Sequence, residues 1–175
     1  SGALSLVVDQ TAPEITLTGG ELTVAHAGTY TDPGATAQDG VDGTMSVEVS
    51  HAVDTATVGV YTVNYSVTDS AGNTVTESRT VRVTDQTAPV ITLNGLSPVT
   101  VEAGETYTDL GASASDTVDG SVSVTVDASA VNVNVLGSYT VTYSATDNAG
   151  NTTSEPRTVI VADATAPAAP TLTGT

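Results

Sequence analysis

Oxygen-bearing side chains recur at matched positions in the two halves of the chain, and they could serve as cation ligands. They are Asp9, Asp39, Asp42, Asp69 and Asn73 in the first half, and Asp85, Asp116, Asp119, Asp147 and Asn151 in the second. Calcium takes about six to eight oxygen ligands from carboxylates and carbonyls in flexible loops. The same residues also favour turns without any ion, because Asp69 can cap a turn in which Gly72 supplies a positive φ. The sequence leaves both interpretations open, with calcium as the candidate cofactor.

Two arginines occupy equivalent positions in a chain that has only three cationic residues, and they are Arg79 and Arg157. Each could be a solvated surface residue. Each could instead form a forked ion pair that fixes a loop, with Asp32 and Asp109 as the first candidate partners. We favour the ion pair, as a structural feature.

Catalytic chemistry has little support in the sequence. The two histidines, His26 and His51, lie in the first half and have no counterpart in the second. A catalytic triad needs a positioned nucleophile and acid, and unrepeated histidines on strand and turn segments are usually surface residues. We therefore expect that the chain is not an enzyme.

These residues lie in a folding unit that the chain contains twice in tandem. The segment Asp9–Pro13 returns as Asp85–Pro89, 76 residues later, and a variant follows at Asp163–Pro167. Self-similarity at a fixed period indicates copies of one folding unit. The predicted boundaries are residues 9–84 for repeat one, 85–162 for repeat two, 1–8 for the end of a preceding repeat or a cloning remnant, and 163–175 for the start of a following repeat.

Composition excludes several classes of partner. Twenty acidic residues and three basic residues give a formal net charge of −17, which disfavours nucleic acid and anionic membranes. There is no cysteine to form a disulfide, and no apolar run is long enough to span a membrane. We expect a monomer whose partners are the neighbouring repeats and a distal ligand that the sequence does not identify.

Alternation of apolar and polar residues predicts the fold. Tyr61, Val63, Tyr65 and Val67 alternate with polar residues, and the segment that contains Tyr139 copies this pattern. A middle strand is expected to carry Met45, Val47 and Val49, and Pro156 is expected at an edge position within the last strand. About seven short strands per repeat predict an all-β protein of two tandem immunoglobulin-like antiparallel β-sandwiches.

Tyr61 and Tyr139 each follow a glycine near the start of a predicted strand, as in a tyrosine corner. In an immunoglobulin-like sandwich the loops after Asp39 and Asp69 lie at the pole where the chain enters. We therefore expect the first set of oxygen ligands at the entrance to repeat one. The second set is expected at the junction between the repeats.

Both repeats resemble a bacterial Ig-like family named for a pesticidal crystal protein and related to the hyalin repeat. The motifs that carry this resemblance are Tyr30–Ala35, Val41–Gly43, Gly59–Val63, Asp69–Asn73 and Arg79–Asp85, and repeat two departs from them at Leu110. The resemblance implies tandem domains of large secreted or surface-anchored bacterial proteins, including adhesins.

The expected function is that of a non-enzymatic extracellular spacer in such a protein, on the bacterial surface or secreted. Calcium at the domain junctions is a candidate for stiffening it. The alternative is a carbohydrate-binding or protein-binding accessory module of a secreted hydrolase. Sugar-binding modules usually expose aromatic platforms, whereas Tyr65 and Tyr143 alternate toward the predicted core.

Overall fold

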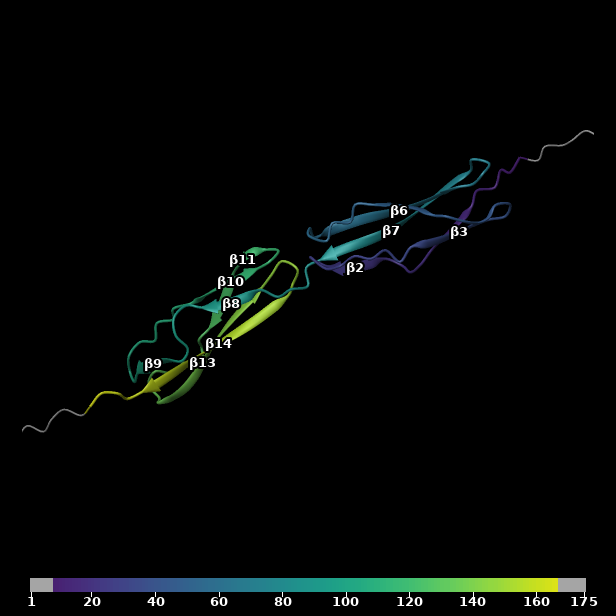
Figure 1. Ribbon diagram of the computed structural model, residues 1–175. Coiled ribbons are helices and arrows are strands. Elements are labelled where there is room, and N and C mark those ends of the chain that lie inside the picture. The colour runs from purple at the N-terminus through teal and green to yellow at the C-terminus, as the bar shows by residue number, and fades with distance from the viewer. Residues whose placement is uncertain (1–7, 167–175) are drawn as a thin grey trace, which may run out of the picture. The chain divides into compact units, whose positions relative to one another are not determined.

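We analysed a computed structural model, which describes residues 8–166 (Figure 1). The chain divides into two compact units, one ending at Gln86 and the other beginning at Thr87. The described residues hold no helix long and apolar enough to cross a membrane. Of the expected ends of neighbouring repeats, residues 1–8 and 163–175, the parts at 1–7 and 167–175 lie outside the described residues.

Each repeat contains a three-stranded sheet and a four-stranded sheet, in agreement with the predicted all-β tandem sandwiches. In repeat one the sheets are β1 (Glu14–Leu17), β3 (Ala35–Asp39) and β4 (Gly43–Met45), and β2 (Leu22–Ala25), β7 (Thr74–Thr84), β6 (Gly59–Thr68) and β5 (Glu48–His51). In repeat two they are β8 (Val90–Leu93), β10 (Ala112–Asp116) and β11 (Gly120–Val122), and β9 (Val99–Glu102), β14 (Thr152–Ala162), β13 (Gly137–Thr146) and β12 (Val124–Asp127).

The long hairpin of β6 and β7 forms the centre of repeat one (Figure 1). Because strand side chains alternate between faces, Val63 and Tyr65 point inward and are fully buried, while Thr62 and Asn64 are exposed. Val81 of β7 completes the buried cluster, against which Ile15 and Leu17 of the other sheet pack. The hairpin of β13 and β14 holds the equivalent cluster in repeat two.

Two details of the strand pattern differ from the prediction. The expected middle strand is two strands, β4 and β5, because the chain passes from the three-stranded to the four-stranded sheet between them. Val49 pairs with Tyr65 but is 44% exposed, because β5 is an edge strand. In addition, the sandwiches are not wholly antiparallel, since β2 pairs with β7, and β9 with β14, in parallel.

β14 as a whole is not an edge strand, because it has neighbours on both sides in its sheet, but Pro156 lies at an edge position, as predicted. β9 pairs only with Val159–Ala162, so at Pro156 the strand faces β13 alone. The proline therefore interrupts no pairing with β9. In the turn where Leu110 replaces the Pro33 of repeat one, Gly34 and Gly111 have similar φ values of 81° and 73°.

Both expected tyrosine corners are present. The hydroxyl of Tyr61 donates to the carbonyl of Thr57 at 2.7 Å, and the hydroxyl of Tyr139 donates to that of Val135 at 2.7 Å. Each bond ties the start of the long strand to the loop that leads into it, four residues upstream. The duplicated sequence thus builds the same local anchor twice.

The burial of Val63 generates a prediction about independent folding of the repeats. Val63→Asp places an unpaired carboxylate in the core and forfeits about 1.5–3 kcal/mol of apolar burial, so repeat one should unfold. Calorimetry should then show loss of one thermal transition, while repeat two keeps its own. Thr62→Asp, on the exposed face of the same strand, is the control. A native transition for repeat one in Val63→Asp would contradict the assigned core.

Candidate functional site

A buried arginine joins the two sheets of repeat one. Arg79 on β7 is 2% exposed, and its Nη1 lies 2.8 Å from Oδ1 of Asp32, which precedes β3. Its Nη2 donates to the carbonyls of Thr18 at 2.7 Å and Gly34 at 3.2 Å, which lie next to β1 and β3. The guanidinium on one sheet therefore holds the backbone of the other sheet.

Tyr65 completes this arrangement. Its hydroxyl donates to Oδ1 of Asp32 at 2.6 Å, and the Arg79 guanidinium carbon lies 5.4 Å from the centroid of its ring. Such a contact adds a cation–π attraction to the ion pair. We name this set of residues, Asp32, Tyr65 and Arg79, the arginine network.

Repeat two contains the same network. Arg157 Nη1 lies 2.6 Å from Oδ1 of Asp109, which also accepts the hydroxyl of Tyr143. The expected ion pairs are therefore confirmed, and neither arginine is a surface residue. The forked geometry differs from the expectation, because one nitrogen binds the carboxylate and the other binds backbone carbonyls.

The arginine network changes the ionisation of its members. Burial raises the pKa of the Tyr65 hydroxyl to about 12, and its hydrogen bond to Asp32 acts in the same direction. Burial also raises the pKa of Asp32, but the hydrogen bonds from Tyr65 and Gly34 and the charge of Arg79 outweigh it and lower the pKa overall. The folded state therefore favours a neutral tyrosine beside a carboxylate.

A second group of polar residues lies where the chain enters repeat one. Asp9 precedes β1, Asp39 ends β3, and Asp69 begins the turn between β6 and β7. One carboxylate oxygen from each lies within 4.8 Å of the others. We name these three residues the entrance cluster of repeat one. Three segments distant in sequence thus place like charges together.

Turn chemistry fixes two of these carboxylates. Oδ1 of Asp39 accepts the backbone N–H groups of Val41 at 2.7 Å and Asp42 at 2.9 Å. Oδ1 of Asp69 accepts the N–H of Asn73 at 2.7 Å, in a turn where Gly72 has a φ of 95°. The turn hydrogen bonds predicted for Asp69 are therefore present, and Asp39 makes similar ones. Oδ2 of Asp39 is left without a donor among the described residues.

The remaining predicted ligands of repeat one are placed differently. Asp42 lies outside the entrance cluster, and its two oxygens accept the N–H and hydroxyl of Ser70 at 2.8 Å each. Asn73 lies beside the cluster, and its Nδ2 donates to Oδ2 of Asp69 at 2.6 Å. Asp42 thus links two loops, whereas Asn73 borders the carboxylates.

Repeat two places most of the corresponding residues in the same way. Asp116 ends β10 and Asp147 begins the turn between β13 and β14, whereas Asp85 precedes Thr87, at which the second unit begins. Asp119 accepts the N–H of Asn148 at 2.6 Å. Asn151 donates to Oδ2 of Asp147 at 2.8 Å.

The two histidines make structural contacts. Nε2 of His26 lies 2.9 Å from the carbonyl oxygen of Ala56, and the ring of His51 meets the ring of Tyr30 edge-on at 5.5 Å. Each contact holds a loop or strand edge within repeat one. Neither contact involves a serine or a carboxylate in the arrangement of a triad.

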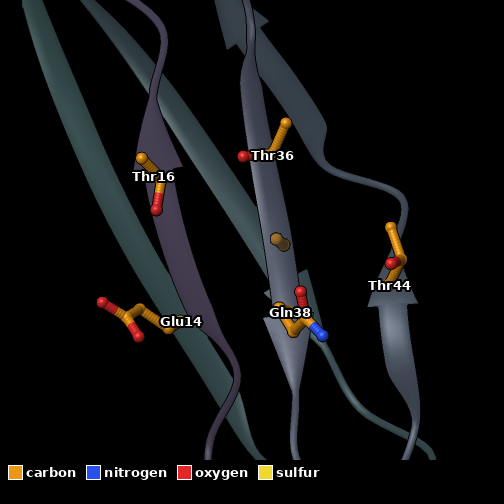
Figure 2. A pocket seen from close by; sticks show the side chains of 6 residues that line it. Glu14, Thr16, Thr36, Gln38 and Thr44 are labelled. Atoms are coloured by element: carbon orange, nitrogen blue, oxygen red, sulfur yellow. The ribbon is translucent and has the colours of Figure 1, made fainter.

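An open groove runs over the outer face of the three-stranded sheet of repeat one, where side chains of β1, β3 and β4 project to solvent (Figure 2). Glu14, Thr16, Thr36, Gln38 and Thr44 line it together with Ala37. This lining contains no aromatic ring on which a sugar could stack. At the matching positions of repeat two, Val90 replaces Glu14 and Ser115 replaces Gln38, so the groove chemistry is not repeated.

Sequence comparison gives a family match in both repeats. The model of a family described as "Bacterial surface protein, Ig-like domain" matches residues 15–83 and 91–161. An uncharacterized 81.3 kDa protein of Acholeplasma phage L2 is 34% identical over 146 residues, which are 77% of this chain and 20% of that protein. The chain therefore spans about a fifth of the length of that relative.

Comparison with solved structures gives partial likenesses. One is a structure of the CBM51-2 domain in complex with GlcNAc and the INT domains of Clostridium perfringens ZmpB, with 32% identity and a TM-score of 0.35 over 49% of this chain and 21% of that one. Another is a lipoprotein of Bacteroides thetaiotaomicron, with 16% identity and a TM-score of 0.40 over 85% and 80%. A ZmpB structure containing the M60 catalytic domain has 16% identity and a TM-score of 0.44 over 86% and 31%.

The arginine network generates a prediction about pH. The folded pKa of Tyr65 lies above its ordinary value of 10.0, so its contribution to stability is complete below pH 10 and is lost as the pH rises toward about 12. Denaturant titration of repeat one across this range should show that loss, and Tyr65→Phe should abolish it. Tyr61→Phe, which keeps the network, should retain the loss. Equal base sensitivity in wild type and Tyr65→Phe would contradict the assignment.

Asp32 should make stability depend on pH in the opposite direction to Tyr65. Its folded pKa lies below the ordinary value of 3.8, so its contribution is complete above that pH and is lost as the pH falls through the folded pKa. Asp32→Asn should make repeat one less stable at neutral pH and less sensitive to acid than wild type. The denaturation midpoint measured from neutral pH downward checks this. An unchanged acid profile would show that another carboxylate controls it.

Proposed function

The chain belongs to the family of bacterial surface protein Ig-like domains, and from this premise we propose that it is a non-enzymatic extracellular spacer. The spacer would be part of a large bacterial surface or secreted protein, an adhesin, and would hold a distal binding domain away from the cell. The narrower kinship with the pesticidal-crystal-protein family and the hyalin repeat stays a prediction.

One observation carries this proposal: the two repeats share their interior, whereas the histidines and the groove lining of repeat one are not repeated. Arg79, Asp32 and Tyr65 recur as Arg157, Asp109 and Tyr143 with the same contacts. By contrast, His26, His51 and the lining of the groove do not recur. Duplication that retains a scaffold and lets its surface vary is typical of modules whose task is length and rigidity.

Calcium is part of this proposal. A cation that ties the start of a repeat to its loops restrains the segment through which one repeat follows another, and a stalk gains stiffness from such restraint. The net charge of −17 suits the same role, because self-repulsion opposes collapse of an array and keeps it soluble.

Replacement in the intact parent protein tests the spacer function. Exchange of residues 9–162 for an unrelated pair of Ig-like domains of equal length should preserve surface attachment of cells or adhesion, because only the distance matters. Deletion of the same residues should reduce adhesion. If the unrelated spacer fails as completely as the deletion, these repeats carry a specific binding function.

The alternative, an accessory module of a secreted hydrolase, has a direct test. The isolated chain should give no saturable signal on an array of bacterial and host glycans. If it binds a defined glycan, and Gln38→Ala in the groove removes that binding while Ser115→Ala does not, the accessory-module function replaces the spacer.

A further inference from the structure

We propose that the entrance cluster of repeat one, Asp9, Asp39 and Asp69, binds one calcium ion. The inference rests on the proposed extracellular function, because calcium modules outside the cell bind at about 10⁻⁴–10⁻³ M, concentrations that a cytoplasmic protein does not meet. It separates the aspartates that bind the ion from those that do not. The sequence alone listed Asp42 and Asp119 as candidate ligands together with the other aspartates.

Buried oxygens without hydrogen-bond donors point to the cation. Asp39 is 4% exposed, and its Oδ1 is occupied by two backbone N–H groups, while its Oδ2 is buried and has no donor among the described residues. Asp9 likewise uses Oδ1 for the N–H of Thr11 at 3.0 Å and buries Oδ2 without a donor in the described part of the chain. Buried acceptors are normally satisfied, so two in one cluster indicate a missing partner.

No arginine ion pair of the described residues reaches the cluster. One oxygen from each of the three carboxylates lies within 4.8 Å of the others. The chain has no lysine, and the two ion-paired arginines bind Asp32 and Asp109 instead. A divalent cation would offset the like charges that the fold brings together here.

Neutral oxygens complete the site. Nδ2 of Asn73 lies near three of them: the carbonyls of Asp9 at 3.3 Å and Thr11 at 3.2 Å, and Oδ2 of Asp69 at 2.6 Å. An amide nitrogen carries two hydrogens, so it cannot satisfy all three well. The oxygens here outnumber the hydrogens that could bind them, and they lie on loops whose geometry can adjust. Such a set suits the larger and more flexible coordination sphere of calcium better than the strict octahedral coordination of magnesium.

Repeat two repeats the contacts of Asn73, because Asn151 Nδ2 donates to the carbonyl of Thr87 at 3.1 Å and to Oδ2 of Asp147. The ion assigned to repeat one would join the segment that enters this repeat to two of its loops.

Titration calorimetry of the whole chain with calcium chloride tests the site. Saturable binding of calcium is expected, with a dissociation constant of about 10⁻⁴–10⁻³ M and weaker binding of magnesium. Asp39→Asn keeps an oxygen for the N–H groups of Val41 and Asp42 but removes a ligand charge, so it should eliminate the site of repeat one. Asp42→Asn removes the same charge from the same loop but no proposed ligand, and should keep that site.

Three results would overturn the proposal: no saturable calcium binding up to about ten times the expected dissociation constant, equal weakening by Asp39→Asn and Asp42→Asn, or equal affinity for magnesium. Thermal unfolding in chelator establishes that both variants fold, so a misfolded protein is not mistaken for a lost site. Such results would remove calcium from the proposed function but would leave the spacer role itself, which the replacement experiment tests separately.

Discussion

A buried guanidinium is the constraint on which each sandwich depends. Arg79 is 2% exposed and Arg157 is 1% exposed, and a charge taken out of water is costly unless it is paired and hydrogen-bonded. Acceptors must therefore stand at fixed positions around it. The same groups occupy these positions in both repeats. They are a carboxylate, a tyrosine hydroxyl that donates to this carboxylate, and two carbonyls of the opposite sheet. A small core without phenylalanine, tryptophan or disulfides thereby acquires a specific connection between its sheets.

The same hairpin connects this interior to the entrance of each repeat. β7 carries Arg79, and the turn that precedes it carries Asp69 and Asn73. Asn73 in turn holds the carbonyls of Asp9 and Thr11, in the segment by which the chain enters the repeat. A repeat therefore holds its incoming segment by residues of its own central hairpin. This organisation fits a member of the bacterial surface Ig-like family for which we propose the function of a spacer built from tandem domains.

Much of the fold followed from local rules in the sequence. Alternation located the core strands, because a strand side chain at Val63 or Tyr65 can point only inward or outward. Recurrence of Arg79 and Asp32 at matched positions predicted their ion pair, since an arginine repeated in a chain with only three cationic residues indicates a fixed partner. Two features could not be predicted from periodicity. The middle strand is divided where the chain passes from one sheet to the other, and β2 pairs with β7 in parallel. Both features depend on contacts between segments that are distant in the sequence. The roles of the acidic residues also depend on partners that are distant in the sequence. Asp39 and Asp42 are three residues apart in one loop, yet Asp39 joins the entrance cluster and Asp42 binds Ser70.

Calorimetry of two matched arginine variants tests the central claim most directly. Arg79 and Arg82 lie three residues apart on β7, with the first buried and the second exposed. Arg79→Met leaves the half-buried Asp32 and two carbonyls without their partner, so the transition of repeat one should lose up to about 3 kcal/mol of stability, while repeat two is unchanged. Arg82→Met should alter stability by no more than about 0.5 kcal/mol. Equal, small effects of the two substitutions would contradict the claim that the buried arginine holds the sandwich together.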